Sequence, residues 1–119
     1  MARIWVADDD ASIRTILEEV LSESFDVSVF ADGEALLESL SSNTPDAIIT
    51  DIKMPNSSGY DVLAHINNNF PDLPVIVMTA FTDMQAAIDS YGAGAFEYLP
   101  KPFDLQDVLS VLNKAVSKS

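Results

Sequence analysis

Short apolar runs rich in β-branched and aromatic residues recur along the chain, and segments in which apolar residues follow helical spacing separate them. The apolar runs cover residues 4–7, 27–30, 47–50, 75–78 and 95–99. Runs of this length and composition predict five β-strands. The clearest helical patterns are Ile13, Ile16, Leu17, Val20 and Leu21, and then Leu105, Val108, Leu109, Leu112 and Val116. Each set predicts an amphipathic helix with one apolar face.

Polar residues mark where several helices should begin. Ser58 is followed three residues later by Asp61, and Thr82 by Gln85, so each pair can satisfy free amide groups in a first helical turn. Three further candidate N-caps are Asp10, Asp32 and Asp104. Strands and helices therefore alternate as five βα units, which predicts an α/β fold with a mostly parallel sheet and helices on both faces.

The polarity of the strands predicts their order in the sheet. The first, third and fourth strands are almost entirely apolar, as expected for central strands that are covered on both faces. The second and fifth carry Ser28 and Glu97 in an alternating pattern, which favours the two edges. A doubly wound order of 2-1-3-4-5 satisfies this pattern, and ligands in such sheets bind beyond the carboxyl ends of the strands.

Length, composition and charge limit the possible functions. A chain of 119 residues with 48% hydrophobic side chains is expected to form one domain, residues 1–119. No apolar run approaches the roughly 20 residues that span a bilayer, and the absence of cysteine fits a reducing compartment, so we expect a cytoplasmic protein without membrane contact. A net charge of −13 disfavours direct binding to nucleic acid.

Residues with reactive or charged side chains follow four of the predicted strands. They are Asp8 and Asp9 after the first strand, Asp51 after the third, Thr79 after the fourth and Lys101 after the fifth. Crowded carboxylates at a sheet edge repel one another unless a cation neutralises them, and an all-oxygen set suits Mg²⁺ or Mn²⁺. We therefore expect Asp51 to attack phosphorus and form an acyl phosphate, while Lys101 and the Thr79 hydroxyl stabilise the phosphoryl oxygens.

Two further polar residues are not assigned to the predicted phosphorylation site. Asp10 adjoins the Asp8–Asp9 pair, but a single carboxylate before a helix is usually a cap, and we interpret it so. His65 is the only histidine and lies on a predicted helix without a partner motif, so we expect a structural or exposed side chain.

Together with its candidate site residues, the whole chain resembles the receiver domain of two-component response regulators. Four blocks carry the resemblance: Asp8-Asp9 with Ser12-Ile13-Arg14, Thr50-Asp51-Ile52-Lys53-Met54-Pro55 with Gly59, Met78-Thr79-Ala80, and residues 94–104. The last block most resembles the NtrC-like transcription regulators. The resemblance implies a flavodoxin-like (βα)5 fold, in which Asp51 accepts a phosphoryl group from the phosphohistidine of a sensor histidine kinase.

The resemblance also implies roles for the residues around Asp51. Asp9 and Asp51 would ligate Mg²⁺ directly together with the backbone carbonyl of Lys53, while Asp8 would act largely through water. Lys101 would pair with the acyl phosphate, and its bond to Pro102 would be cis. Thr79 would move toward the phosphoryl group and Tyr98 would follow it inward. This movement would reshape the face made by the fourth helix, fifth strand and fifth helix, which would control an effector, expected to be transcriptional.

Two other functions fit parts of the pattern. A Mg²⁺-dependent phosphatase that uses an aspartyl phosphate would carry a second acid two residues after the nucleophile, where this chain has Lys53. A degenerate receiver would lack some reactive positions, whereas all are filled here. We therefore expect a phosphoacceptor switch that promotes its own phosphorylation and dephosphorylation, and not an enzyme.

Other properties stay open. Ser58 stands where many receiver domains have an acidic or other polar residue before the glycine. Lys53 and Phe81 occupy variable positions that tune the lifetime of the phosphate, so the sequence leaves this lifetime open. The chain stops soon after its fifth helix at Lys118-Ser119, without an ATPase or DNA-binding region, so we expect either a stand-alone regulator or a receiver cut from a longer protein.

Overall fold

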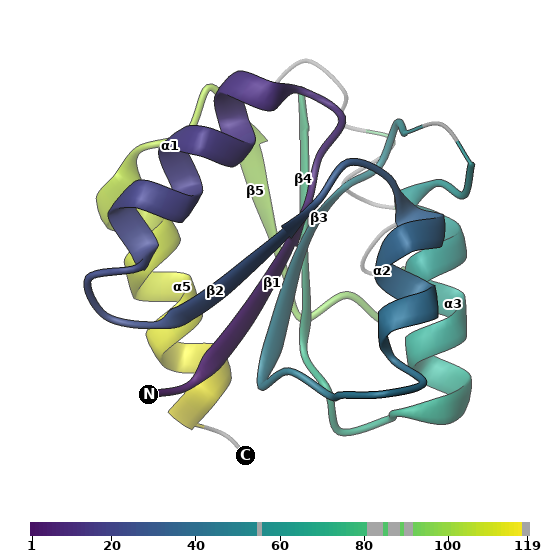
Figure 1. Ribbon diagram of the computed structural model, residues 1–119. Coiled ribbons are helices and arrows are strands. Elements are labelled where there is room, and N and C mark those ends of the chain that lie inside the picture. The colour runs from purple at the N-terminus through teal and green to yellow at the C-terminus, as the bar shows by residue number, and fades with distance from the viewer. Residues whose placement is uncertain (55, 81–84, 86–88, 90–91, 118–119) are drawn as a thin grey trace.

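The protein forms a five-stranded parallel sheet with helices on both faces (Figure 1). The structure is a computed structural model that describes residues 1–54, 56–80, 85, 89 and 92–117. Its strands are β1 (Arg3–Ala7), β2 (Asp26–Phe30), β3 (Ala47–Asp51), β4 (Val75–Ala80) and β5 (Glu97–Lys101). Its helices are α1 (Ala11–Leu21), α2 (Gly33–Ser39), α3 (Gly59–Asn69) and α5 (Leu105–Ser117). The strand order is β2-β1-β3-β4-β5, which confirms the predicted doubly wound arrangement.

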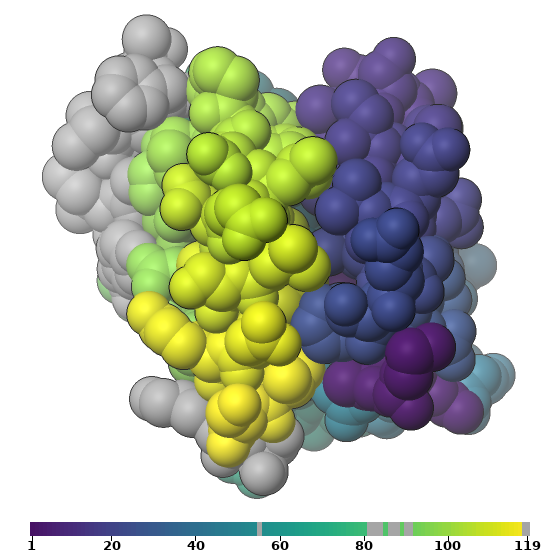
Figure 2. Space-filling view, turned by 90° about the vertical axis from the view of Figure 1, so that its left-hand side faces the viewer, coloured from purple at the N-terminus to yellow at the C-terminus, as the bar shows by residue number. Residues whose placement is uncertain are grey.

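Alternate residues of the central strands pack into two separate cores. On one face, Ile4, Val6, Ile49 and Met78 are buried with residues of α1 and α5, and Figure 2 shows these two helices side by side over that face. On the other face, residues of β1, β3 and β4 pack against α2 and α3. All five residues of β3 are buried, because both faces of this central strand are covered.

The predicted helix caps agree with the structure where it describes them. Asp10 accepts a hydrogen bond from the amide of Ser12 at 2.8 Å, and Asp32 accepts one from Ala35 at 2.8 Å. Ser58 and Asp61 form a reciprocal capping box at the start of α3. Asp104 likewise accepts from the amide of Gln106 at 2.8 Å, beside α5. Most of the predicted fourth helix, including Thr82 of its Thr82–Gln85 cap, lies outside the described residues.

Some strand bounds and one helix position differ from the predictions. β3, β4 and β5 continue to Asp51, Ala80 and Lys101, beyond their predicted ends at residues 50, 78 and 99. The fifth strand begins at Glu97 rather than at residue 95, because the chain turns at Gly94 with a φ of 101° and pairs with β4 only from Glu97 onward. Ile16 was placed on the apolar face of the first helix but is 43% exposed. Leu17 and Leu21, four residues apart, face the core instead, and Ile16 is rotated away from Leu17 by about 100° around the helix. Within the described part of the chain, no helix has the length and apolar character needed to cross a membrane.

Candidate functional site

The carboxyl ends of the parallel strands bring the predicted site residues to one edge of the sheet. Asp8 follows β1 directly, Asp51 ends β3, and Lys101 ends β5. Thr79 is the penultimate residue of β4, where it pairs with Pro100, and its side chain is buried. The parallel register therefore gathers residues that are far apart in the sequence, as the sheet order predicted.

Lys101 bridges the two buried carboxylates. Its Nζ lies 2.7 Å from Oδ2 of Asp8 and 3.0 Å from Oδ2 of Asp51. The Asp8 side chain is fully buried, the Asp51 side chain is 12% exposed and the Lys101 side chain is 22% exposed. Charge-assisted hydrogen bonds of this length fix the relative positions of the three side chains.

Backbone amides hold the other oxygens of the same carboxylates. Oδ1 of Asp8 accepts a hydrogen bond from the amide of Asp10 at 2.9 Å, and Oδ1 of Asp51 accepts one from the amide of Ile52 at 2.7 Å. Each carboxylate thus has a partner on both oxygens. Their orientation is set by the backbone on one side and by Lys101 on the other.

One ammonium does not fully compensate two buried carboxylates. Burial raises the pKa of Asp8 above its usual value, and the neighbouring charge of Asp51 adds to this, although the bonds from Lys101 and the Asp10 amide act in the opposite direction. Burial also depresses the pKa of Lys101, but its hydrogen bonds to Asp8 and Asp51 outweigh that effect, so its pKa is raised overall. The site keeps an excess of negative charge that favours a further cation.

The carboxylates are arranged so that they could share a metal ion. Asp8, Asp9 and Asp51 each offer an oxygen atom, and these atoms all lie within 4.8 Å of one another. Asp9 is exposed, whereas Asp8 and Asp51 are buried, so a cation would reach the site from the Asp9 side. Three carboxylate oxygens form the donor set of a hard divalent cation, and the residues therefore fit the Mg²⁺ or Mn²⁺ expected from the sequence.

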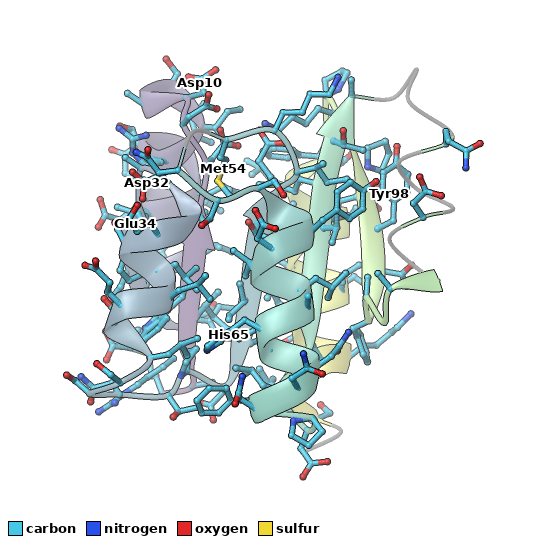
Figure 3. All side chains as sticks on the ribbon, turned by 90° about the vertical axis from the view of Figure 1, so that its right-hand side faces the viewer. Asp10, Asp32, Glu34, Met54, His65 and Tyr98 are labelled. Carbon is cyan, nitrogen blue, oxygen red and sulfur yellow. The ribbon has the colours of Figure 1, made fainter. Side chains whose placement is uncertain are left out.

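Tyr98 lies on β5 three residues before Lys101. Figure 3 shows it near the edge of the sheet formed by β4 and β5, away from the labelled Asp10 and Asp32. Its hydroxyl group donates to the backbone carbonyl of Ala80 at 3.4 Å, and Ala80 is the residue after Thr79. The half-buried ring is thus linked to the segment that carries the Thr79 hydroxyl. The movement of both residues stays a prediction.

The predictions for residues around the carboxylates are confirmed in part, and the others stay predictions. The Lys101–Pro102 peptide is cis, as the resemblance implied. His65 is exposed on α3, as expected. Lys53 lies in the connection between β3 and α3, and the role of its carbonyl stays a prediction. Phe81 lies outside the described residues.

Two contacts near the site were not predicted. Arg14 was quoted only as part of a motif, yet its Nη1 donates to the backbone carbonyl of Asp8 at 2.7 Å and secures the turn between β1 and α1. Asn56 had no assigned role, yet its side-chain amide donates to Oδ2 of Asp32 at 3.2 Å. The position of Arg14 in the first turns of a helix after Asp8 was a usable signal. The contact of Asn56 spans 24 residues and had none.

Known proteins share this architecture and part of this sequence. The sequence model of the response regulator receiver domain matches residues 4–113. The transcriptional regulator NtrC of Escherichia coli K12 is 44% identical over 115 residues, which are 96% of this chain and 24% of that protein. The receiver domain of the Francisella response regulator 1452 superimposes with a TM-score of 0.92 at 27% identity, over 99% of this chain and 98% of that one. The DrrB receiver domain in its BeF3-activated form superimposes with a TM-score of 0.91 at 28% identity, over 98% of each chain.

The chain spans about a quarter of the length of the NtrC proteins that it matches, which share 39–44% of its residues and come from several bacteria. With the receiver model covering nearly all of the sequence, this chain belongs to the response regulator receiver domain family, in its NtrC-like branch.

Proposed function

We propose that the protein is a phosphoacceptor switch in which Asp51 receives a phosphoryl group from the phosphohistidine of a sensor histidine kinase. The observation that carries this proposal is the placement of Asp51 at the end of β3, where Lys101 contacts it and where Asp8 and Asp9 offer oxygens within 4.8 Å. An oxygen of Asp51 forms the new O–P bond as the N–P bond of the phosphohistidine breaks. The electron pair of the broken bond stays on the imidazole nitrogen.

Each residue at the edge of the sheet has a distinct part in this transfer. The Lys101 ammonium already lies 3.0 Å from Asp51 and can follow the charge onto the phosphoryl oxygens. The Thr79 hydroxyl can donate a hydrogen bond to the same oxygens. Asp9 and Asp51, with the Lys53 carbonyl, would hold Mg²⁺, and Asp8 would act through water. When bound, Mg²⁺ supplies the positive charge that lets an anionic nucleophile approach an anionic phosphoryl group.

The phosphoryl group would alter the protein by shifting an existing equilibrium. Thr79 and Lys101 make charge-assisted contacts to the phosphoryl oxygens only in the phosphorylated form, and a few kcal/mol of differential interaction suffices to make a minor state dominant. The contact of the Tyr98 hydroxyl with the Ala80 carbonyl supplies a path from Thr79 to the outer surface. The output surface would comprise the fourth helix, β5 and α5, and would control an effector domain or protein, expected to be transcriptional.

Several properties of the working protein follow from this proposal. It would not be an enzyme that turns over a separate substrate, although it would promote its own phosphorylation and dephosphorylation. It would act in the cytoplasm, where a kinase and an effector are its partners. The net charge of −13 supports the proposal that this domain does not bind nucleic acid itself.

Incubation with acetyl phosphate and Mg²⁺, followed by intact-mass measurement, tests the nucleophile. Wild type should gain one base-labile phosphoryl group, and Asp51→Asn should gain none. Asp26→Asn is a matched control, because Asp26 is an exposed carboxylate at the opposite end of the sheet. Mapping of the phosphate to Ser57, Ser58 or Thr79 would show that the proposed mechanism is wrong.

The switch has a separate test. Thr79→Ala should still accept phosphate, but NMR spectra with and without beryllofluoride should show a weaker response at Tyr98 than in wild type. If wild type itself shows shifts at the carboxylate site while Tyr98 and α5 stay unmoved, the proposed output surface has no support.

A further inference from the structure

The connection between β3 and α3 adopts an unusual backbone conformation beside the candidate metal site. Asn56 has a φ of 58° and Ser57 a φ of 116°, both in the left-handed region that non-glycine residues rarely adopt. The connection closes on itself, because the amide of Gly59 donates to the carbonyl of Ile52 at 2.8 Å. Strained backbone of this kind persists only when the surrounding structure holds it in place.

The start of α2 supplies that support. Oδ2 of Asp32 accepts the hydrogen bond of the Asn56 side-chain amide at 3.2 Å, while Oδ1 of the same carboxylate caps α2 through the Ala35 amide at 2.8 Å. The next residue, Gly33, lies directly against the connection, since a Cβ atom there would be 2.4 Å from the carbonyl oxygen of Ser57. Asp32 and Gly33 at the start of α2 therefore lie against Asn56 and Ser57 of the connection.

The same connection lies next to the metal-binding residues. It begins at Ile52, whose amide orients Asp51, and contains Lys53, whose carbonyl is the expected third direct oxygen ligand beside Asp9 and Asp51. Its Met54 is partly buried against the core formed with α2 and α3, and Figure 3 shows Met54 and Asp32 at the same end of the molecule. Because Mg²⁺ tolerates little deviation from octahedral geometry, small displacements of such a ligand should weaken binding.

We infer that Asp32 and Asn56 form a clamp between α2 and the β3–α3 connection that positions this connection for binding of a divalent cation. Both are positioning residues, since neither lies among the carboxylates that would contact the metal. The inference rests on the proposed function, because it gives the clamp a role in the same metal site. It extends that function to a contact formed by two residues 24 positions apart in the sequence.

Exchange of the Asp32 and Asn56 side chains distinguishes the positioning effect of their hydrogen bond on cation binding from an effect of net charge or of backbone flexibility. Asn56→Asp alone places two carboxylates against each other and should break the clamp. It also adds negative charge near the site, which by itself would strengthen cation binding, so weaker binding would identify a positional effect. The double variant Asp32→Asn with Asn56→Asp has the net charge of wild type. In it, the Asn amide can donate to Asp while its oxygen still caps α2.

The experiment is calorimetric titration with Mg²⁺ at a temperature where each variant is folded by circular dichroism. We expect Asn56→Asp and Asn56→Gly to weaken binding by about tenfold, the low end for residues that support metal ligands. The double exchange should recover most of the wild-type affinity. Ser57→Gly is the matched control, because it adds the same flexibility next to the clamp without removing the hydrogen bond, and it should bind like wild type.

The outcomes distinguish the inference from the proposed function. Equal binding by wild type and Asn56→Asp would overturn the clamp, and so would weak binding that the double exchange fails to restore. Loss of affinity in Ser57→Gly as large as in Asn56→Gly would overturn it as well. If wild type does not bind Mg²⁺, or if Asp9→Asn binds it equally, the metal site of the proposed function fails instead. Should Asn56→Gly not fold, Asn56→Asp and the double exchange decide the question.

Discussion

Lys101→Met removes the ammonium group that bridges Asp8 and Asp51 and leaves two carboxylates facing each other at the end of the sheet. Removal of one partner from a buried ion pair typically costs about 3–5 kcal/mol, because a charge then stays buried without compensation. Here the Lys101 side chain is 22% exposed and Asp51 is 12% exposed, so water can supply part of the lost stabilisation. We therefore expect the free energy of unfolding near neutral pH to fall by about 2 kcal/mol.

The pH dependence gives this prediction a second, independent readout. The pKa of Asp8 is already raised in the folded protein by burial, and loss of Lys101 should raise it further. A carboxyl group with a raised pKa binds protons more readily when folded than when unfolded. Its contribution is fully present below the ordinary value of 3.8 and is lost as pH rises through the folded pKa. The destabilisation of Lys101→Met should therefore shrink as the pH is lowered toward 4.

Urea denaturation followed by circular dichroism, in EDTA and across this pH range, measures both effects. Lys114→Met is the matched control, because Lys114 is 63% exposed and lies 3.8 Å from Glu97 in a surface pair that should contribute little. Added Mg²⁺ should restore part of the stability of Lys101→Met by replacing the missing positive charge. A variant as stable as wild type at neutral pH, or one whose deficit does not change with pH, would refute the reasoning.

Two further predictions concern the start of α2. Gly33→Ala should destabilise the protein by about 1–3 kcal/mol, since its Cβ would lie 2.4 Å from the Ser57 carbonyl oxygen. Gly92→Ala is the control in the same thermal melts and should not destabilise the protein, because open space surrounds Gly92. The amide of Ala35 and the side chain of Asn56 lower the pKa of Asp32, so its contribution is present above 3.8 and is lost as pH falls through the lowered value. Asp32→Ala should therefore reduce the free energy of unfolding near neutral pH. In urea melts, the difference in unfolding free energy from wild type should become smaller as the pH is lowered. A difference that persists at low pH would contradict the role given to the Asp32 carboxylate.

The sequence predicted what local chemistry and parallel topology determine. Apolar runs located the strands, and the polar residues Ser28 and Glu97 identified the two edge strands. Once that order was known, Asp8, Asp51 and Lys101 had to meet, because the carboxyl ends of parallel strands lie at one edge. The observed distances from Lys101 to both carboxylates agree with that reasoning.

Other features depend on information that local patterns lack. The bond between Asp32 and Asn56 depends on how two loops meet in space, and neither residue type signals the other across 24 positions. The exposure of Ile16 depends on which side of α1 faces the sheet. Helical spacing alone is equally compatible with an apolar face that includes Ile16 and with one that leaves it out. The late start of β5 depends on the register with β4, which begins at Ile76 and Glu97.

The contacts that fix the site differ in whether they depend on charge. Backbone amides of Asp10 and Ile52 hold one oxygen of each buried carboxylate through uncharged donors. Lys101 holds the other oxygens through its charge, so we expect its contacts to change when a cation or a phosphoryl group is added. Burial is the main reason why the pKa of Asp8 is raised, and the charge of Asp51 adds to it, although the hydrogen bond from Lys101 acts in the opposite direction. In the proposed switch, phosphorylation would therefore change the side-chain contacts of Lys101 first, while the backbone hydrogen bonds to Asp8 and Asp51 could stay formed.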